Sequence, residues 1–262
     1  MTNEELRRQL EYFQDLGIKD LYKRKPTLDT RISCASAKPD LTPASTPIQP
    51  TPEMRLSGAS PQPMELPGLA PENDTLTRIS NDIGDCTRCR LSKGRNKIVF
   101  GDGNPESKLV FVGEGPGADE DAQGIPFVGR AGQLLTQMIE NTAAKEGIRI
   151  KRPDVYICNV VKCRPPENRN PEPDEMQICG QFLFRQLSVI KPKAICALGS
   201  TAAKALLGGK DGVTKLRGNW HKWHDIPLFV TYHPSYLLRA YNQAAKREAW
   251  EDLKKILHFV YD

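Results

Sequence analysis

The stretch "KLVFVG" (residues 108–113) is a short run of aliphatic and aromatic residues that stops at a glycine. Three similar stretches follow it along the chain: "VYICNVV" (155–161), "AICALG" (194–199) and "LFVTYH" (228–233). Short apolar runs bounded by turn residues are typical of strands that are buried on both faces of a sheet. These four stretches therefore predict the strands of one central sheet.

Helical patterns separate these strands. Apolar residues recur at spacings of three and four in four segments, which are 132–147, 173–190, 200–209 and 247–260. The repeated order of strand and helix predicts an α/β fold, with a mainly parallel four-stranded sheet covered by helices on both faces. In such sheets, ligands bind beyond the carboxyl ends of the strands.

The chain divides into three parts. Residues 1–25 carry apolar side chains at helical intervals and predict a short amphipathic helix. Residues 26–75 form a Pro/Ser/Thr-rich segment with ten of the 21 prolines and no aromatic residue, which predicts a disordered linker. The strand and helix patterns fall within 76–262, which we expect to be the folded domain.

Charge and hydropathy narrow the range of partners. The formal net charge is +5, and the positive excess lies in the folded domain, which is compatible with a polyanionic partner. The N-terminus has no signal sequence, and no apolar run is long enough to cross a membrane. We therefore expect a soluble, cytoplasmic protein without a membrane partner.

The cysteines indicate a metal centre. Seven cysteines, an odd number, in a reducing compartment favour metal ligation over a disulfide framework. Cys86 and Cys89 form a Cys-x-x-Cys motif, while Cys163 and Cys179 flank a proline-rich loop. Four thiolates without a nearby histidine indicate a Cys₄ zinc site or an iron–sulfur cluster. The wide second spacing favours the cluster, and Cys196 is the reserve ligand should Cys163 fail.

The first strand is followed by a segment with the residues of a ligand pocket. "GEGPGADEDAQGIPFVG" (113–129) lacks both the Gly-Lys-Ser/Thr of a phosphate-binding loop and the glycine spacing of a dinucleotide site. It does contain a glycine, Gly113, that would let a ligand approach the backbone closely. It also contains the carboxylates Glu114 and Glu120 and one aromatic ring, Phe127. The segment therefore predicts a pocket at the end of the first strand.

Three motifs and the cysteines together resemble the family 4 uracil-DNA glycosylases, which carry an iron–sulfur cluster. The motifs are "GEGPGADED" continuing to "GIPFVGRAGQLL", "NVVKCRPPENRNP" and "HPSYLLR", and the resemblance covers about residues 80–258. It implies a three-layer α/β/α sandwich and hydrolytic removal of uracil from DNA, which leaves an abasic site and starts base excision repair of deaminated cytosine. It also implies a [4Fe–4S] cluster bound by four cysteines: Cys86, Cys89, Cys163 and Cys179.

The resemblance also implies how uracil is bound. The base must leave the stack before an enzyme can reach its glycosidic bond. Phe127 is expected to stack on the flipped ring, and Gly113 to let it approach the strand end. Asn159 can accept a hydrogen bond from uracil N3–H and donate one to O4, the reverse of what cytosine requires. His233 can donate to O2 as the leaving base becomes anionic.

Other residues are expected to bind the reacting water and the DNA. We expect a carboxylate to orient the water and balance the oxocarbenium-like charge, with Glu114 first and Glu120 second. Leu237 is expected to fill the gap left by the flipped nucleotide, and Arg239 to bind a phosphate.

The expected substrates are uracil-containing single- and double-stranded DNA. We expect a monomer that is nucleoid-associated in a prokaryote, with the helix over 1–25 free to bind a repair or replication protein. Two other classes of protein stay open on the sequence. A non-catalytic, cluster-containing DNA-binding module would have broken pocket residues, and a Cys₄ zinc protein acting on another nucleotide would be colourless and would release no uracil.

Overall fold

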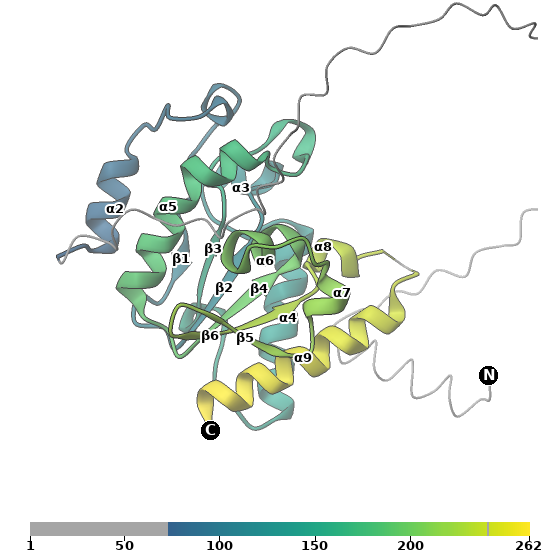
Figure 1. Ribbon diagram of the computed structural model, residues 1–262. Helices are drawn as coiled ribbons and strands as arrows, with labels where there is room; N and C mark the ends of the chain where they lie inside the picture. The colour runs from purple at the N-terminus through teal and green to yellow at the C-terminus, as the bar shows by residue number, and fades with distance from the viewer. Residues whose placement is uncertain (1–72, 240) are drawn as a thin grey trace, which may run out of the picture.

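The structure, a computed structural model, describes residues 73–239 and 241–262 (Figure 1). The helix predicted over 1–25 lies outside these residues, as does nearly all of the linker predicted over 26–75. Asp74 already belongs to the fold, because the Nε of Arg185 donates to its Oδ2 at 2.6 Å. Asp74 therefore contacts the domain expected over 76–262.

The central sheet of the described chain has six strands in the order β1-β3-β2-β4-β6-β5. The inner four are parallel and match the four predicted strands, while β1 and β5 pair antiparallel at the two edges. The prediction of four strands is thus corrected to six. Both extra strands lack an apolar pattern, because β1 has two residues and β5 is mostly exposed. The strands are β1 (Asp102–Gly103), β2 (Leu109–Gly113), β3 (Tyr156–Asn159), β4 (Ala194–Leu198), β5 (Trp220–Trp223) and β6 (Ile226–Thr231).

The helices include all four that the sequence predicts. The bounds of α5 coincide with the prediction because Pro173 occupies its first turn and Lys191 ends it in a left-handed conformation. The α-helices are α2 (Leu76–Ile83), α3 (Ala118–Gln123), α4 (Arg130–Lys145), α5 (Pro173–Ile190), α6 (Gly199–Leu207), α7 (Val213–Leu216), α8 (Pro234–Leu237) and α9 (Gln243–Tyr261). The short 3₁₀ helices are η1 (Arg90–Lys93), η2 (Arg152–Asp154) and η3 (Pro166–Asn168).

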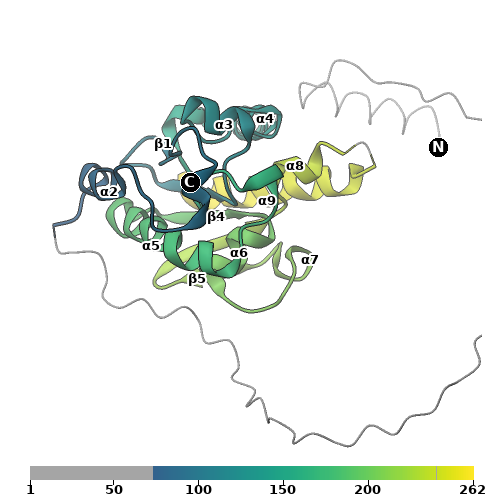
Figure 2. The ribbon, with the colours of Figure 1, turned by 90° about the horizontal axis from the view of Figure 1, so that it is seen from above.

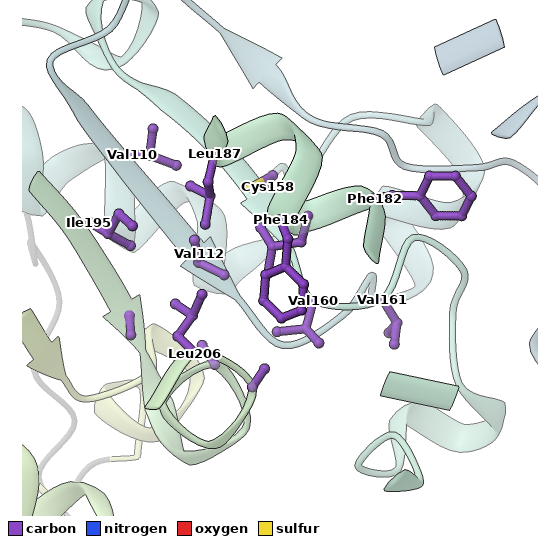
Figure 3. Packing of buried hydrophobic residues seen from close by; sticks show 14 of the residues in the cluster. Val110, Val112, Cys158, Val160, Val161, Phe182, Phe184, Leu187, Ile195 and Leu206 are labelled. Carbon is purple, nitrogen blue, oxygen red and sulfur yellow. The ribbon is translucent and has the colours of Figure 1, made fainter. Parts of the chain in front are cut away.

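The helices cover the sheet on both faces, which confirms the α/β sandwich (Figures 1 and 2). Alternate residues of β2 face the two cores: Val110 and Val112 pack with α2, α5 and α6, and Leu109 and Phe111 pack with α4 and α9. Figure 3 shows the first core, where Leu187 of α5 lies over β2. Among the described residues, no helix combines the length and apolar character needed to span a membrane.

Candidate active site

A pocket of about 390 Å³ opens where β2, β3 and β6 end. Five of the residues that the sequence singles out line it together: Glu114, Glu120, Phe127, Asn159 and His233. They converge because parallel strands end at one edge of the sheet.

Asn159 is the last residue of β3, and it is 1% exposed. Its side-chain Oδ1 is buried and has no hydrogen-bond partner among the residues that the structure describes. Buried polar atoms nearly always have partners, and leaving one unpaired costs about 1–3 kcal/mol. The pocket therefore holds an acceptor that is suited to an N–H group of a ligand.

Gly113 lets two pocket side chains meet the end of β2. A Cβ atom at this position would lie 2.4 Å from Asn159 Oδ1 and 2.5 Å from Phe127 Cζ. Both distances are far shorter than a van der Waals contact. Any side chain larger than hydrogen would push the Asn159 amide or the Phe127 ring out of place.

Phe127 forms the aromatic side of the pocket. Its backbone has φ +54°, a left-handed conformation that is unusual for a bulky residue, and its ring is largely buried. The ring centroid lies 5.6 Å from that of His233. The α4 helix presses on this turn, since a Cβ on Gly132 would lie 1.9 Å from the carbonyl carbon of Phe127.

His233 stands at the start of α8 as a neutral imidazole. Its Nδ1 accepts the backbone N–H of Ser235 at 3.2 Å and also contacts Ser235 Oγ at 2.8 Å. Because a backbone N–H can only donate, Nδ1 carries no proton and Nε2 does. Burial lowers the pKa of His233 to about 4, so the ring is uncharged at neutral pH. It can therefore donate one hydrogen bond from Nε2.

The two candidate carboxylates differ in what they already bind. Glu120 accepts the backbone N–H groups of Gly117 at 3.1 Å and of Val128 and Gly129 at 2.9 Å. Glu114 is half-buried, and within the described part of the chain it accepts only the Thr201 hydroxyl, through Oε2. Burial raises the pKa of Glu114, and this hydrogen bond opposes the shift in part. Glu114 thus keeps a free oxygen for a water, whereas Glu120 holds the turn.

The two leucines after His233 differ in how far they are exposed. Leu237 is 1% exposed and lies against α4 beside Leu134 and Met138, so it cannot enter a base stack without leaving the core. The next residue, Leu238, is 37% exposed and lines the pocket. Arg239 is also exposed, and its Nη1 donates to Tyr241 Oη at 3.1 Å.

The four predicted cysteine ligands lie together around a second, small cavity. They come from the loop after α2, the loop after β3 and the helix α5, and their neighbours in the cavity wall are mostly apolar. Cys196 packs in the core on the opposite face of the sheet, so it is not a reserve ligand. The four thiols that line this cavity belong to Cys86, Cys89, Cys163 and Cys179.

N–H donors point at three of these sulfurs. Arg88 Nη1 lies 3.5 Å from Cys86 Sγ, Arg95 Nη1 lies 3.5 Å from Cys163 Sγ, and the backbone N of Lys162 lies 3.2 Å from Cys179 Sγ. Such donors stabilise thiolates. Within 73–239 and 241–262, no three His, Cys, Asp or Glu side chains are arranged to bind a single metal ion. The four thiol groups line the wall of this small cavity.

Comparison with known proteins gives the family. Residues 100–254 match the model of the uracil DNA glycosylase superfamily. The type-4 uracil-DNA glycosylase of Thermotoga maritima is 46% identical over 184 residues, which cover 70% of this chain and 93% of that protein. The chain belongs to the type-4 uracil-DNA glycosylases. The type-4 enzyme of Sulfurisphaera tokodaii is 43% identical over 191 residues, 70% of this chain and 84% of that protein.

Type 5 is more distant. The type-5 uracil-DNA glycosylase of Pyrobaculum aerophilum is 30% identical over 158 residues, 55% of this chain and 67% of that protein. The superfamily match spans every pocket residue named above, but it begins after Cys86 and Cys89. The type-4 matches are longer than that segment.

Several residues that the sequence analysis did not select shape the pocket of this type-4 glycosylase. Thr201 binds Glu114 from α6, Ser235 fixes the tautomer of His233, and Arg152 binds the turn that carries Phe127. Each acts through contacts with residues distant in sequence or with backbone atoms. Only Ser235 could have been noticed, because a hydroxyl two residues after a helix-capping histidine can bind it.

Proposed function

We propose that the chain is a monofunctional uracil-DNA glycosylase, which flips uracil out of DNA, hydrolyses its N-glycosidic bond and leaves an abasic site. The observation that carries this proposal is the buried, unpaired Oδ1 of Asn159, which complements uracil N3–H within a pocket of the type-4 family. The reaction starts base excision repair of deaminated cytosine.

The pocket chemistry fits a leaving group that becomes an anion. The Phe127 ring offers a stacking face, and the Asn159 amide can pair with N3–H and O4. The Nε2–H of neutral His233 can donate to O2 as negative charge develops there, as in an oxyanion hole. Cytosine would leave these groups unpaired, because its N3 accepts and its N4 donates.

We assign Glu114 to the attacking water. Its free oxygen can orient a water molecule, and its negative charge balances the oxocarbenium-like sugar. Glu120 acts as a positioning residue, since its oxygens hold three backbone N–H groups.

The function is tested with a 5′-labelled oligonucleotide that carries one uracil, as a single strand and in duplexes opposite guanine or adenine. Incubation followed by alkali should cleave the uracil strand at one position and leave matched thymine and cytosine strands intact. Intact uracil strands in every case would overturn the proposal and favour a non-catalytic DNA-binding module. Release of a different base would favour another nucleotide substrate.

Replacing Glu114 by glutamine should lower activity and raise stability at the same time. Uracil excision should fall by about a hundredfold or more, because the variant loses the carboxylate beside the water. Burial raises the pKa of Glu114, so the folded state binds this proton more tightly than the unfolded state and loses stability as pH rises above the usual pKa of 4.5. Glutamine removes that loss, so the melting temperature at pH 7 should exceed that of wild type.

The advantage should shrink as pH falls to 4.5 and below, where both states of the wild type bind the proton. The exposed Glu106→Gln variant is the control and should change neither quantity. A Glu114→Gln enzyme with wild-type excision and a lower melting temperature at pH 7 would contradict both assignments.

We propose that Leu238, not Leu237, enters the gap left by the flipped nucleotide. Leu238→Ala should change the free energy of unfolding by no more than about 0.5 kcal/mol. It should lower excision from duplex DNA more than from single strands, because a single strand has no base stack with a gap to fill. Leu237→Ala should instead lower the free energy of unfolding by about 2–5 kcal/mol, because it empties a core position. Urea unfolding and excision assays on both substrates measure the difference, and the opposite pattern would restore Leu237 as the inserting residue. Arg239 would bind a phosphate.

We further propose that Cys86, Cys89, Cys163 and Cys179 bind a [4Fe–4S] cluster. The four thiols line one cavity and receive N–H donors on three sulfurs, which suits iron–thiolate ligation. When bound, the cluster would supply iron–thiolate bonds that join three separate segments of the chain.

The remaining proposals concern the oligomeric state, the DNA substrates and residues 1–72, which the structure does not describe. We propose that the protein acts as a monomer on single- and double-stranded DNA, and that the segment over 1–25 binds a repair or replication protein through a linker over 26–75. Deleting residues 1–72 should leave excision from short oligonucleotides within about twofold of wild type, since every pocket residue that the structure describes lies beyond them. A large loss of activity on naked DNA would instead make this segment part of the catalytic unit.

A further inference from the structure

The pocket needs Phe127 in one orientation, and the structure shows how a distant residue holds it. We infer that Arg152 is a positioning residue, which fixes the stacking face of Phe127 for the base. This inference rests on the proposed function, because the stacked base is the uracil of the proposed reaction.

Arg152 binds the Phe127 turn through two hydrogen bonds and the helix α4 through a third. Its Nη2 donates to the carbonyl oxygen of Pro126 at 2.6 Å, and its Nη1 donates to that of Phe127 at 2.9 Å. The same Nη1 lies 3.1 Å from Thr136 Oγ1 on α4. The guanidinium thus ties two successive carbonyls of the turn to the helix that follows it.

The turn needs such a partner because its backbone is strained. Phe127 has φ +54°, and conformations of this kind cost about 1–3 kcal/mol and persist only when the surroundings fix them. Pro126 and Phe127 are both buried, so their carbonyls require donors from the protein. Arg152 supplies both donors from one planar group.

Arg152 also connects the two sides of base recognition. It lies in η2, a few residues before β3, and that strand ends at Asn159. One short segment therefore carries the residue that reads the base edge and the residue that holds the stacking ring. A Cβ on Gly113 would strike both Asn159 and Phe127, so little space exists for either to shift alone.

Only arginine satisfies this geometry. The planar guanidinium of arginine can donate to two carbonyl oxygens and a hydroxyl at the same time. The ammonium group of lysine is a compact charge at the end of a flexible aliphatic chain and cannot reproduce these three directions. We therefore expect Arg152→Lys to fold normally and still misplace the ring. A ring displaced by about 1 Å can lower a rate by about a hundredfold.

Four proteins test this role: wild type, Arg152→Ala, Arg152→Lys and the exposed Arg149→Ala control. Single-turnover excision and the half-saturating DNA concentration are measured with and without guanidinium chloride at non-denaturing millimolar concentrations, alongside melting temperature. Arg152→Ala should lose about tenfold to a hundredfold in excision, and guanidinium should restore part of the loss by occupying the vacated site. Guanidinium should not stimulate wild type or the Arg149→Ala control.

The outcomes separate the two proposals. Absence of uracil release by wild type refutes the proposed function, whatever the variants do. With an active wild type, wild-type excision by Arg152→Ala would overturn the positioning role. The positioning role would also be overturned if Arg152→Ala kept the wild-type melting temperature but lost excision activity that guanidinium did not restore. Should Arg152→Ala be too unstable to purify, Arg152→Lys decides: full activity refutes the inference, and a folded enzyme with reduced excision supports it.

Discussion

Replacing Asn159 by alanine is expected to lower the single-turnover rate of uracil excision by about a hundredfold to a thousandfold. The Asn159 amide can accept from N3–H and donate to O4 of the same base, and among the described residues its Oδ1 has no other partner. Its interaction should strengthen as the base becomes an anion, so the loss should fall mainly on the chemical step. The Asn219→Ala variant, which changes an exposed asparagine outside the pocket, should retain wild-type rates.

The Asn159→Asp variant distinguishes base reading from a structural role. An ionised carboxylate offers only acceptors, so it should repel uracil O4 and could accept N4–H₂ of cytosine. Uracil excision should therefore fall strongly, with traces of cytosine excision that the alanine variant lacks. Rates on uracil and cytosine strands are the measurement. Wild-type excision by Asn159→Ala would show that the residue only ends its strand and that the base binds elsewhere.

The second large effect is expected for Cys163→Ser. Anaerobically purified wild type should be brown with about four irons per chain, as Cys₄ ligation of a [4Fe–4S] cluster requires. Removing one thiolate should lower the iron content, bleach the colour and release the loop that joins β3 to α5. Each kcal/mol of lost unfolding free energy lowers the melting temperature of a domain of this size by about 2–4 °C. The loss of the cluster should therefore lower the melting temperature by about 10 °C.

The matched control is Cys196→Ser, which changes an equally buried cysteine outside the cysteine-lined cavity. Its hydroxyl is poorly accommodated in the core and should cost some stability, about 1–3 kcal/mol, while colour and iron content remain. Iron analysis, visible absorption and thermal unfolding measure both variants. A colourless Cys196→Ser and a brown Cys163→Ser would refute the ligand assignment.

The inner part of the fold could be predicted from sequence because its signals are local. Four buried apolar runs gave the parallel strands, and Pro173 with the break at Lys191 gave the bounds of α5. The edge strands β1 and β5 could not be predicted in this way. They form because neighbouring strands offer free backbone groups, whereas their own residues are few or exposed.

The same distinction holds for the pocket. Glu114, Asn159 and His233 could be selected because each stands at or just beyond the end of a predicted strand, where parallel sheets bind ligands. The choice between Leu237 and Leu238 depends on which side of the one-turn helix α8 packs against α4, and adjacent leucines give no periodic signal for it. Arg152 was missed because it acts on backbone carbonyls, which every residue has.

The order of the two sites along the chain has a consequence for synthesis on the ribosome. All four cysteines of the second cavity have been made once residue 179 is complete, together with β1, β2 and β3. The pocket still lacks His233, and β4 still lacks its neighbour β6. A nascent chain thus has its full set of thiols well before it can act on a base.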